Sequence, residues 1–472
     1  MLNEELLYKI KDGIKLSKRQ QFALVFYLSI PAVMAQVTSV VMQYIDASMV
    51  GSLGAHASAS IGLMSSSTWL FGGICGAVAS GFSIQAAHSI GGGKLKEARS
   101  IMRQSITAAF IASIFLVALG ILIGINLPAW LGGAKEIQKD AKYYFIIYIL
   151  SLPAIQFNRL AGGLLQCSGN MKVPGILNTL MCFLDVIFNS LLIFPTRKVH
   201  IASTTIFVHG AGLGVAGAAL GTALSQLVIA GFMMWFLCFK SSIFKINRKE
   251  SFKIKKDCIS RAAKLAFPIG WENFMMCGAM IVSTRIVAPL GAVSIAANSF
   301  AITAESLCYM PGYGIGEAAA TLTGQSIGAG RKELAKRFAK ITVWSGIISM
   351  TVTGIAMFIA APAMMALLTP DTAIRTLGVS ILRIEAFAEP MYGASIVAAG
   401  AFRGAGDTLV PSMMNFFSIW FVRITLALLL VKNFELKGMW IAMCVELCFR
   451  GMIFMVRLYR EKWINITLPI KE

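Results

Sequence analysis

Long apolar runs follow one another along the chain, separated by short polar connections. A hydrocarbon core of about 30 Å needs roughly 20 helical residues to cross it, and these unbroken runs lack the alternating period of barrel strands. Twelve transmembrane helices are predicted, over residues 20–50, 56–90, 97–128, 138–167, 172–196, 211–239, 258–289, 294–327, 333–368, 373–402, 408–432 and 436–459. The pattern therefore predicts an all-α, multi-pass membrane protein.

The sequence contains an internal repeat, in which matching residues recur at an offset of 237 positions. The matching residues are Pro31 with Pro268, Gly54 with Gly291, Gly91 with Gly328, Gly163 with Gly400 and Asn178 with Asn415. A single repeat of this length indicates a duplicated domain, which in membrane proteins is typical of transporters. We expect two pseudo-symmetric six-helix lobes that enter the membrane in the same orientation, with a cleft between them.

The expected organisation has five parts. They are a basic amphipathic N-terminal segment 1–19, an N-terminal lobe 20–239, a linker 240–257, a C-terminal lobe 258–459 and a short tail 460–472. The first apolar segment is long and follows a charged stretch, so we expect it to stay in the membrane rather than act as a cleaved signal peptide.

Composition and charge agree with a membrane location and exclude nucleic acid as the partner. The chain is 57% hydrophobic and 14% charged, and its net charge of +20 comes from basic residues gathered in alternate connections. That distribution indicates membrane orientation, and it places both termini and the linker in the cytoplasm of a plasma-membrane protein. The nine cysteines lie in or beside apolar spans, and we interpret them as small buried side chains rather than disulfides.

Acidic residues within the spans are the candidate functional groups. A charged side chain at mid-membrane costs at least about 2.5 to 3.5 kcal/mol on insertion scales, so each one needs a partner, an aqueous cavity or a proton. The acids are Asp46, Asp185, Glu272, Glu305, Glu317, Glu385, Glu389 and Glu446. The two copies of the repeat do not share them, since Asp46 has Ser283 as its mate and Glu272 has Ala35. The scaffold is symmetric, whereas the ionisable chemistry is not.

In the first lobe, Asp185 and Asn189 lie four residues apart and share one helical face. Their carboxylate and amide oxygens could bind Na⁺, or the carboxylate could carry a proton; a helix-packing hydrogen bond is the alternative. Asp46 either joins them or caps the turn at Gly51. Thr222 follows a run of small residues and either adds a hydroxyl or packs against a neighbouring helix.

In the second lobe, Glu272 follows Pro268 by four residues and Glu389 directly precedes Pro390. A proline frees backbone groups and favours a kink, which is a common setting for a functional carboxylate. We expect both acids to face the cleft, with a salt bridge inside the lobe as the alternative. Candidate salt-bridge partners are Arg285 and Arg423, while Glu446 is expected to pack near Arg450.

Three segments carry a resemblance to a known family: the segment from Pro31 to Asp46, Gly324-Gln325-Ser326-Ile327-Gly328-Ala329-Gly330, and Arg403-Gly404-Ala405-Gly406-Asp407-Thr408. The chain resembles multidrug and toxic compound extrusion (MATE) transporters over nearly its whole length. The resemblance implies a V-shaped pair of lobes that exports organic, often cationic, compounds in exchange for Na⁺ or H⁺, with no other cofactor. We expect a monomer whose partners are small cationic or amphipathic substrates and membrane lipids.

The resemblance also implies a cation site in the N-terminal lobe, on Asp46, Asp185, Asn189 and Thr222. The family usually has Asn first in the fifth-span pair, whereas this chain has Asp then Asn, which leaves the choice between Na⁺ and H⁺ open. In the C-terminal lobe, the resemblance places substrate or cation binding on three residues. Glu272 matches an acid of the seventh span, and the family's acid of the tenth span falls on Tyr392, about one turn from Glu389.

We therefore expect a secondary active antiporter that works by alternating access, not an enzyme. The main alternative is a flippase for lipid-linked oligosaccharides, which would need several cationic residues inside its cleft to hold a pyrophosphate. An intramembrane aspartyl protease is a weaker alternative, since Asp407 lies in a connection and its repeat mate is Asn170, both typical turn residues.

Overall fold

The computed structural model describes residues 2–201, 204–246 and 255–465. Its first half contains α1 (Leu2–Lys11), α2 (Lys18–Gly51), α3 (Ala55–Gly91), α4 (Leu95–Gly124), α5 (Leu127–Trp130), α6 (Lys135–Cys167), α7 (Lys172–Leu192), α8 (Gly214–Trp235) and the π-helical η1 (Phe236–Lys240). The second half contains α9 (Lys256–Val287), the 3₁₀ turn η2 (Ala288–Leu290), α10 (Ala292–Gly328), α11 (Lys332–Leu368), α12 (Thr372–Glu385), α13 (Glu389–Gly404), α14 (Leu409–Phe417), the π-helical η3 (Ser418–Arg423), α15 (Ile424–Arg460) and the 3₁₀ turn η4 (Lys462–Asn465). The middle of the expected linker and the end of the expected tail lie outside the described residues.

The predicted helical membrane fold is confirmed. Within the described ranges, nine helices are long and apolar enough to cross a membrane. The last of them makes two crossings, because Glu435 has non-helical backbone angles (φ 50°, ψ −132°) inside α15. Helix α10 and the pair α12 and α13 bring the crossings to the twelve expected from the hydrophobic pattern.

Two segments differ from the expected spans. The tenth span is not one helix, since α12 ends at Glu385 and α13 begins at Glu389. The reason is local: Pro390 stands at the start of α13, where its missing N–H is tolerated, and it disfavours helical geometry before it. The fifth span ends at Leu192, and an antiparallel hairpin of β1 (Pro195–Ile201) and β2 (Thr204–Ala211) follows, which the hydrophobic pattern did not predict.

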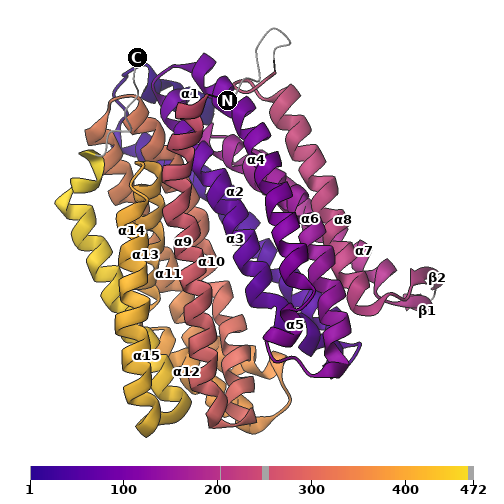
Figure 1. Cartoon of the computed structure of the whole chain (residues 1–472). Helices are drawn as coiled ribbons and strands as arrows, with labels where there is room; N and C mark the ends of the chain where they lie inside the picture. The colour runs from indigo at the N-terminus through magenta and orange to yellow at the C-terminus, as the bar shows by residue number, and fades with distance from the viewer. Residues whose placement is uncertain (1, 202–203, 247–254, 466–472) are drawn as a thin grey trace.

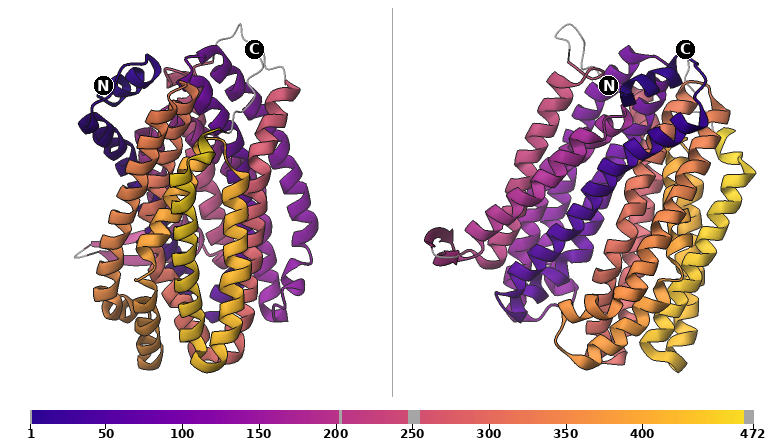
Figure 2. Two further views of the ribbon diagram at one scale, coloured as in Figure 1. Left: turned by 90° about the vertical axis from the view of Figure 1, so that its left-hand side faces the viewer. Right: turned by 180° about the vertical axis from the view of Figure 1, so that it is seen from behind.

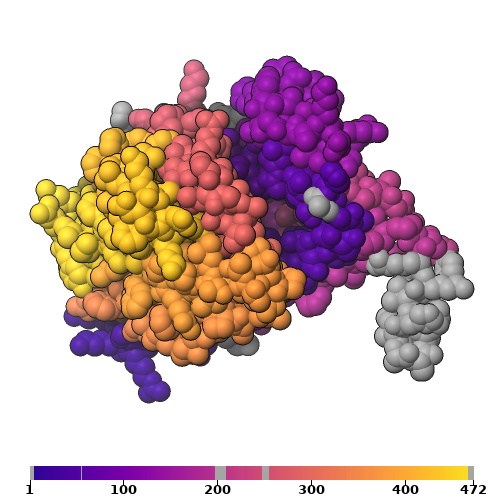
Figure 3. All heavy atoms as spheres, turned by 90° about the horizontal axis from the view of Figure 1, so that it is seen from below, coloured from indigo at the N-terminus to yellow at the C-terminus, as the bar shows by residue number. Residues whose placement is uncertain are grey.

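The helices form two halves that diverge from a common end. In Figure 1 the first half, indigo to magenta, stands beside the second half, salmon to yellow, and both chain ends lie at the same end of the bundle. The reverse view shows the halves leaning apart toward the opposite end (Figure 2). From that opposite end the surface is hollowed between the two halves (Figure 3). The V-shaped arrangement with a cleft is therefore present, and the cleft opens away from the termini.

At the closed end, the two halves meet through a pair of hydrogen bonds related by the 237-residue repeat. The His88 ring Nε2 lies 2.8 Å from the Gly404 carbonyl oxygen and donates to it. The Gln325 side chain donates to the Cys167 carbonyl at 2.7 Å. Gln325 is the repeat mate of His88, and Gly404 is the repeat mate of Cys167. The duplicated sequence thus produces a pseudo-two-fold clasp between the halves.

Two glycines allow the helix ends α3 and α10 to touch in this clasp. A Cβ atom at Gly91 would overlap the backbone of Gln325, and one at Gly328 would overlap the His88 carbonyl. Gly91 and Gly328 are themselves repeat mates, so the glycine-rich strings that recur in the sequence mark the contact of the two halves rather than phosphate-binding loops. Only glycine fits this approach of one backbone to the other.

Replacing Gly91 with Ala is expected to open the clasp. An added methyl group that must push a backbone aside costs about 1 to 3 kcal/mol, which shifts a conformational equilibrium by roughly five- to 150-fold. Hydrogen–deuterium exchange should rise at the ends of α3 and α10. Gly62→Ala is the matched control in the same helix, because nothing lies within 4 Å of its Cβ position. Equal exchange in the two variants would contradict the assignment of the clasp.

Candidate functional site

The four residues expected to form a cation site in the first half are brought together by three helices. Asn189 on α7 donates its side-chain amide to Asp46 Oδ1 of α2 and to Asp185 Oδ2 of α7, each at 2.9 Å. The Asp46 and Asp185 carboxyl groups also contact one another, and Thr222 of α8 contacts the Asp185 carboxyl. The capping role considered for Asp46 is therefore not what the structure shows.

Ser225 completes this set, and the sequence analysis missed it. Its hydroxyl lies 3.2 Å from Asp185 Oδ1 and 2.9 Å from the Thr222 carbonyl oxygen. The available signal was its position three residues after Thr222, which places both side chains on one face of α8. Gly221 lets α8 pack closely against α7, because a Cβ atom at this position would overlap the Asn189 side chain.

The polar atoms of the site fit a proton or a hard monovalent cation. Asp185 and Asn189 are buried, and the Asn189 Oδ1 atom has no hydrogen-bond donor. Neither Asp46 nor Asp185 forms a salt bridge with a described lysine or arginine. Two adjacent carboxylates repel one another unless a proton or a cation lies between them. The arrangement can therefore take up positive charge, although the role of these residues stays a prediction.

Glu272, by contrast, has an arginine that balances its charge. The Arg403 guanidinium on α13 lies 3.0 Å from both Glu272 carboxylate oxygens, and Ser412 and Asn415 on α14 donate to the same group at 2.8 and 2.7 Å. Glu272 is buried within the second half. The salt bridge considered as the alternative is thus present, with Arg403 instead of Arg285 as its partner.

Glu446 forms the second ionic cluster of this half. Its carboxylate accepts hydrogen bonds from Arg423 at 2.6 and 2.9 Å, from Arg450 at 2.8 and 2.9 Å, and from Ser418 at 2.6 Å. The expected contact with Arg450 is present. Arg423, which was considered as a partner for Glu389, binds Glu446 instead, and the cluster ties the π-helical segment η3 to α15.

Glu389 and Glu385 flank the break in the tenth span. Each is 1% exposed, and none of their four carboxyl oxygens has a hydrogen-bond partner. Tyr392, one turn after Glu389, packs its ring against Tyr309 at 5.6 Å and under the Arg450 guanidinium at 5.6 Å. Glu389 and Tyr392 therefore lie inside the second half, and their part in substrate or cation binding stays a prediction.

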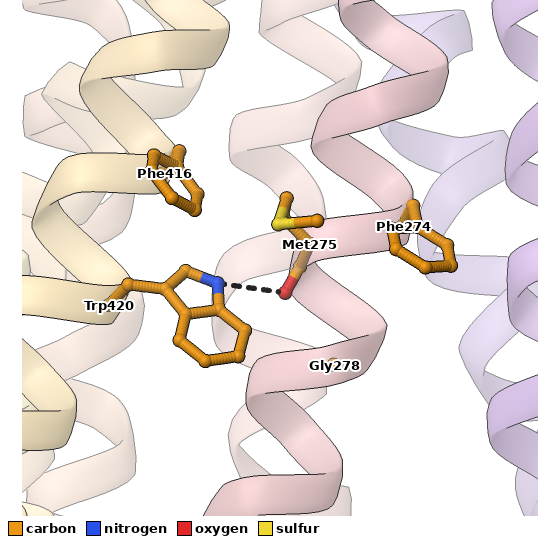
Figure 4. Close-up of a pocket in the computed structure, with 5 residues that line it drawn as sticks. All are labelled: Phe274, Met275, Gly278, Phe416 and Trp420. Carbon is orange, nitrogen blue, oxygen red and sulfur yellow. Dashed lines mark hydrogen bonds between the residues drawn. The ribbon is translucent and has the colours of Figure 1, made fainter.

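An apolar groove of about 350 Å³ lies between α9 and the segment formed by α14 and η3. It is lined by Phe274, Met275, Gly278, Phe416 and Trp420. Figure 4 shows Trp420 reaching across to α9, where its indole N–H donates to the Met275 carbonyl at 3.2 Å, while Phe274 lies on the other side of the helix. None of these five lining residues is ionisable, and all of them belong to the second half. The groove is therefore not part of the candidate cation site.

Comparison with known proteins places the chain in a family. A family model described as MatE matches residues 31–191 and 268–429, two segments that begin at the same offset as the internal repeat. A curated relative from Thermotoga maritima, "Probable multidrug resistance protein NorM", is 26% identical and the match covers 94% of each chain. "Uncharacterized transporter YisQ" of Bacillus subtilis is 24% identical over 82% of this chain and 83% of that protein.

Solved structures agree on the fold. A transporter of the MOP superfamily from Pyrococcus furiosus, described as having a binding pocket of reverse polarity, superposes with a TM-score of 0.87 at 18% identity, covering 98% of this chain and 99% of that one. An outward-facing multidrug resistance MATE transporter superposes with a TM-score of 0.84 at 19% identity, covering 93% and 96%. The two matched repeats, the V-shaped bundle and these likenesses lead to one conclusion: the chain belongs to the MatE family of multi-pass membrane transporters.

Proposed function

We propose that this protein exports small organic compounds, including cationic and amphipathic ones, across the plasma membrane in exchange for Na⁺ or H⁺. The observation that carries the proposal is the pair of carboxyl groups of Asp46 and Asp185, bridged by the Asn189 amide and without a basic partner among the described residues. Relatives named as multidrug resistance proteins support export as the direction of transport.

Alternating access accounts for the shape of the molecule. The cleft opens away from the termini, and the distribution of basic residues assigns the termini to the cytoplasm, so the described state faces outward. Ion entry from outside at Asp46 and Asp185 then favours closure of the outer end and opening of the inner end. Each elementary charge that crosses the membrane potential contributes about 2.3 kcal/mol per 100 mV, enough to bias two states that differ by a few kcal/mol.

Helix α2 is the physical connection between the ion site and the two halves. It carries Asp46 near its outer end, and near its middle its backbone at Val33 packs so closely on α10 that a side chain at Gly314 would not fit. A movement of α2 toward α7 when positive charge neutralises the carboxyl groups would therefore shift its contact with the second half. This coupling by a packed helix is part of the proposal.

A lipid flippase fits the charges less well. It requires several free cations along the cleft for a pyrophosphate group. In the described part of the second half, however, Arg403, Arg423 and Arg450 each bind a carboxylate. Arg159, on α6 of the first half, has no carboxylate at salt-bridge distance among the described residues. These pairings support an exporter over a flippase.

The test is dye transport in proteoliposomes energised separately by a Na⁺ gradient and by a proton gradient. We expect uphill movement of a fluorescent organic cation with one of the two gradients, and that gradient identifies the coupling ion. The ionophore that collapses that gradient should stop transport within the same preparation. Dye movement that is independent of both gradients would contradict coupled antiport.

A further inference from the structure

The floor of the cleft contains a polar contact between the halves. The Glu317 carboxylate on α10 accepts the Gln36 side-chain amide of α2 at 2.9 Å on Oε1, and the Gln166 amide of α6 at 2.8 Å on Oε2. Thr321, one turn farther along α10, donates to the Gln166 carbonyl at 3.1 Å. Both amide donors are neutral, and no described lysine or arginine lies within salt-bridge distance of the Glu317 carboxyl group.

Arg159 of α6, in the first half, lies near this contact. It precedes Gln166 by seven residues, two helical turns, so the two side chains leave α6 on the same side. Since Gln166 meets α10 of the opposite half, Arg159 also faces that half. The Arg159 guanidinium interacts electrostatically with Glu317 and with Tyr148, yet it forms no hydrogen bond or salt bridge within the part of the chain that the structure describes.

The exposed side chain of Arg159 must face water rather than lipid. The side chain is exposed although it lies well inside α6, eight residues before the helix ends at Cys167. An arginine directed at hydrocarbon costs at least about 2.5 to 3.5 kcal/mol, so an unpaired guanidinium at this position faces the cleft. A guanidinium presents a planar fork of N–H donors that matches the two oxygens of a carboxylate.

We propose that Arg159 binds an anionic group, a carboxylate, of the transported compound. The inference rests on the export function proposed above and assigns to Arg159 the recognition of the carboxylate in zwitterionic compounds that also carry a cationic nitrogen. Glu317 provides a hydrogen-bond acceptor for the cationic nitrogen, because two of the roughly four lone-pair positions of its carboxyl group remain for an ammonium donor. The cleft floor thus offers a guanidinium on one side of the interface of the halves and a carboxyl acceptor on the other.

A matched pair of dyes tests this assignment: a rhodamine with a free carboxylate and the methyl ester of the same rhodamine. Arg159→Gln should raise the KM for the free acid about tenfold and leave the KM for the ester unchanged or lower. Arg159→Lys should recover part of the loss for the acid, because it restores the charge without the fork. Binding of both dyes to purified protein, followed by fluorescence anisotropy, should show the same selectivity without any gradient.

Arg383→Gln is the control, since that exposed arginine lies on α12 of the second half with its guanidinium 5.2 Å from the Phe358 ring centre. Neither dye should respond to it. Equal loss of both dyes in Arg159→Gln would overturn the inference and assign Arg159 to the closure of the halves through Glu317. Selective binding of the acid without gradient-driven transport would instead overturn the export proposal and leave the Arg159 assignment standing.

Discussion

Asp46→Asn is expected to abolish ion-driven export while the protein still folds. The substitution keeps the size of the side chain and its position beside Asn189, but it removes one of the two groups that can hold a proton or offset the charge of Na⁺. Loss of a charged interaction of about 3 kcal/mol weakens cation binding by more than 100-fold. Transport energised by the coupling gradient should therefore fall to the level of empty liposomes.

The measurement is initial dye uptake in proteoliposomes with equal amounts of reconstituted protein. Asp140→Asn, an exposed acid near the start of α6, is the matched control and should transport normally. Equilibrium binding of the dye should survive in Asp46→Asn, because the proposed ion site lies on α2, α7 and α8, whereas the proposed dye contacts are on α6 and α10. Ion-driven uptake at the wild-type rate would remove Asp46 from the coupling mechanism.

Glu446→Gln is expected to give the largest loss of stability. The Glu446 carboxylate is fully buried and binds both the half-buried Arg423 and the buried Arg450, so the substitution removes the charged group that holds both guanidinium groups. Breaking a buried ion pair by removing one partner costs about 3 to 5 kcal/mol. The π-helical segment η3 should lose its attachment to α15, and we expect aggregation of the purified variant or a strongly lowered Tm.

The thermal midpoint of detergent-solubilised protein, followed by size-exclusion chromatography, measures this effect. Glu461→Gln is the control, because Glu461 pairs with Lys336 and Lys340 at the surface, where solvent screens the interaction. Its thermal midpoint should change little. Wild-type stability in Glu446→Gln would mean that the two arginines find other partners, and the ionic cluster would then have no structural role.

The fold was predictable because it follows from features that can be read along the sequence: the length of the apolar runs and the internal repeat. The length of each apolar run predicted the membrane crossings, and the offset of 237 residues predicted two similar halves. The details that escaped prediction depend on short-range backbone chemistry: the break before Pro390 and the hairpin that starts at Pro195. Proline marked both places, but a hydropathy pattern does not distinguish a broken helix from a continuous one.

The candidate cation site was partly accessible from the sequence. Asp185 and Asn189 share a helical face at a spacing that any α-helix imposes, so their contact followed from the sequence alone. The contact of Asn189 with Asp46 joins residues 143 positions apart, and the resemblance to a family, not the spacing, suggested it. Ser225 escaped notice because a serine in an apolar span usually bonds to its own helix backbone.

The chain by itself determined a membrane protein of two repeated six-helix halves, because hydrophobic length and repetition act along the sequence. The tertiary structure alone decided which charges meet. Glu272 binds Arg403, Arg423 binds Glu446, and Arg159 has no carboxylate at hydrogen-bonding distance within the described ranges of the chain. These outcomes depend on how helices distant in sequence pack and on which helix face each residue occupies, and the side-chain periodicity of one helix carries no information about its neighbour.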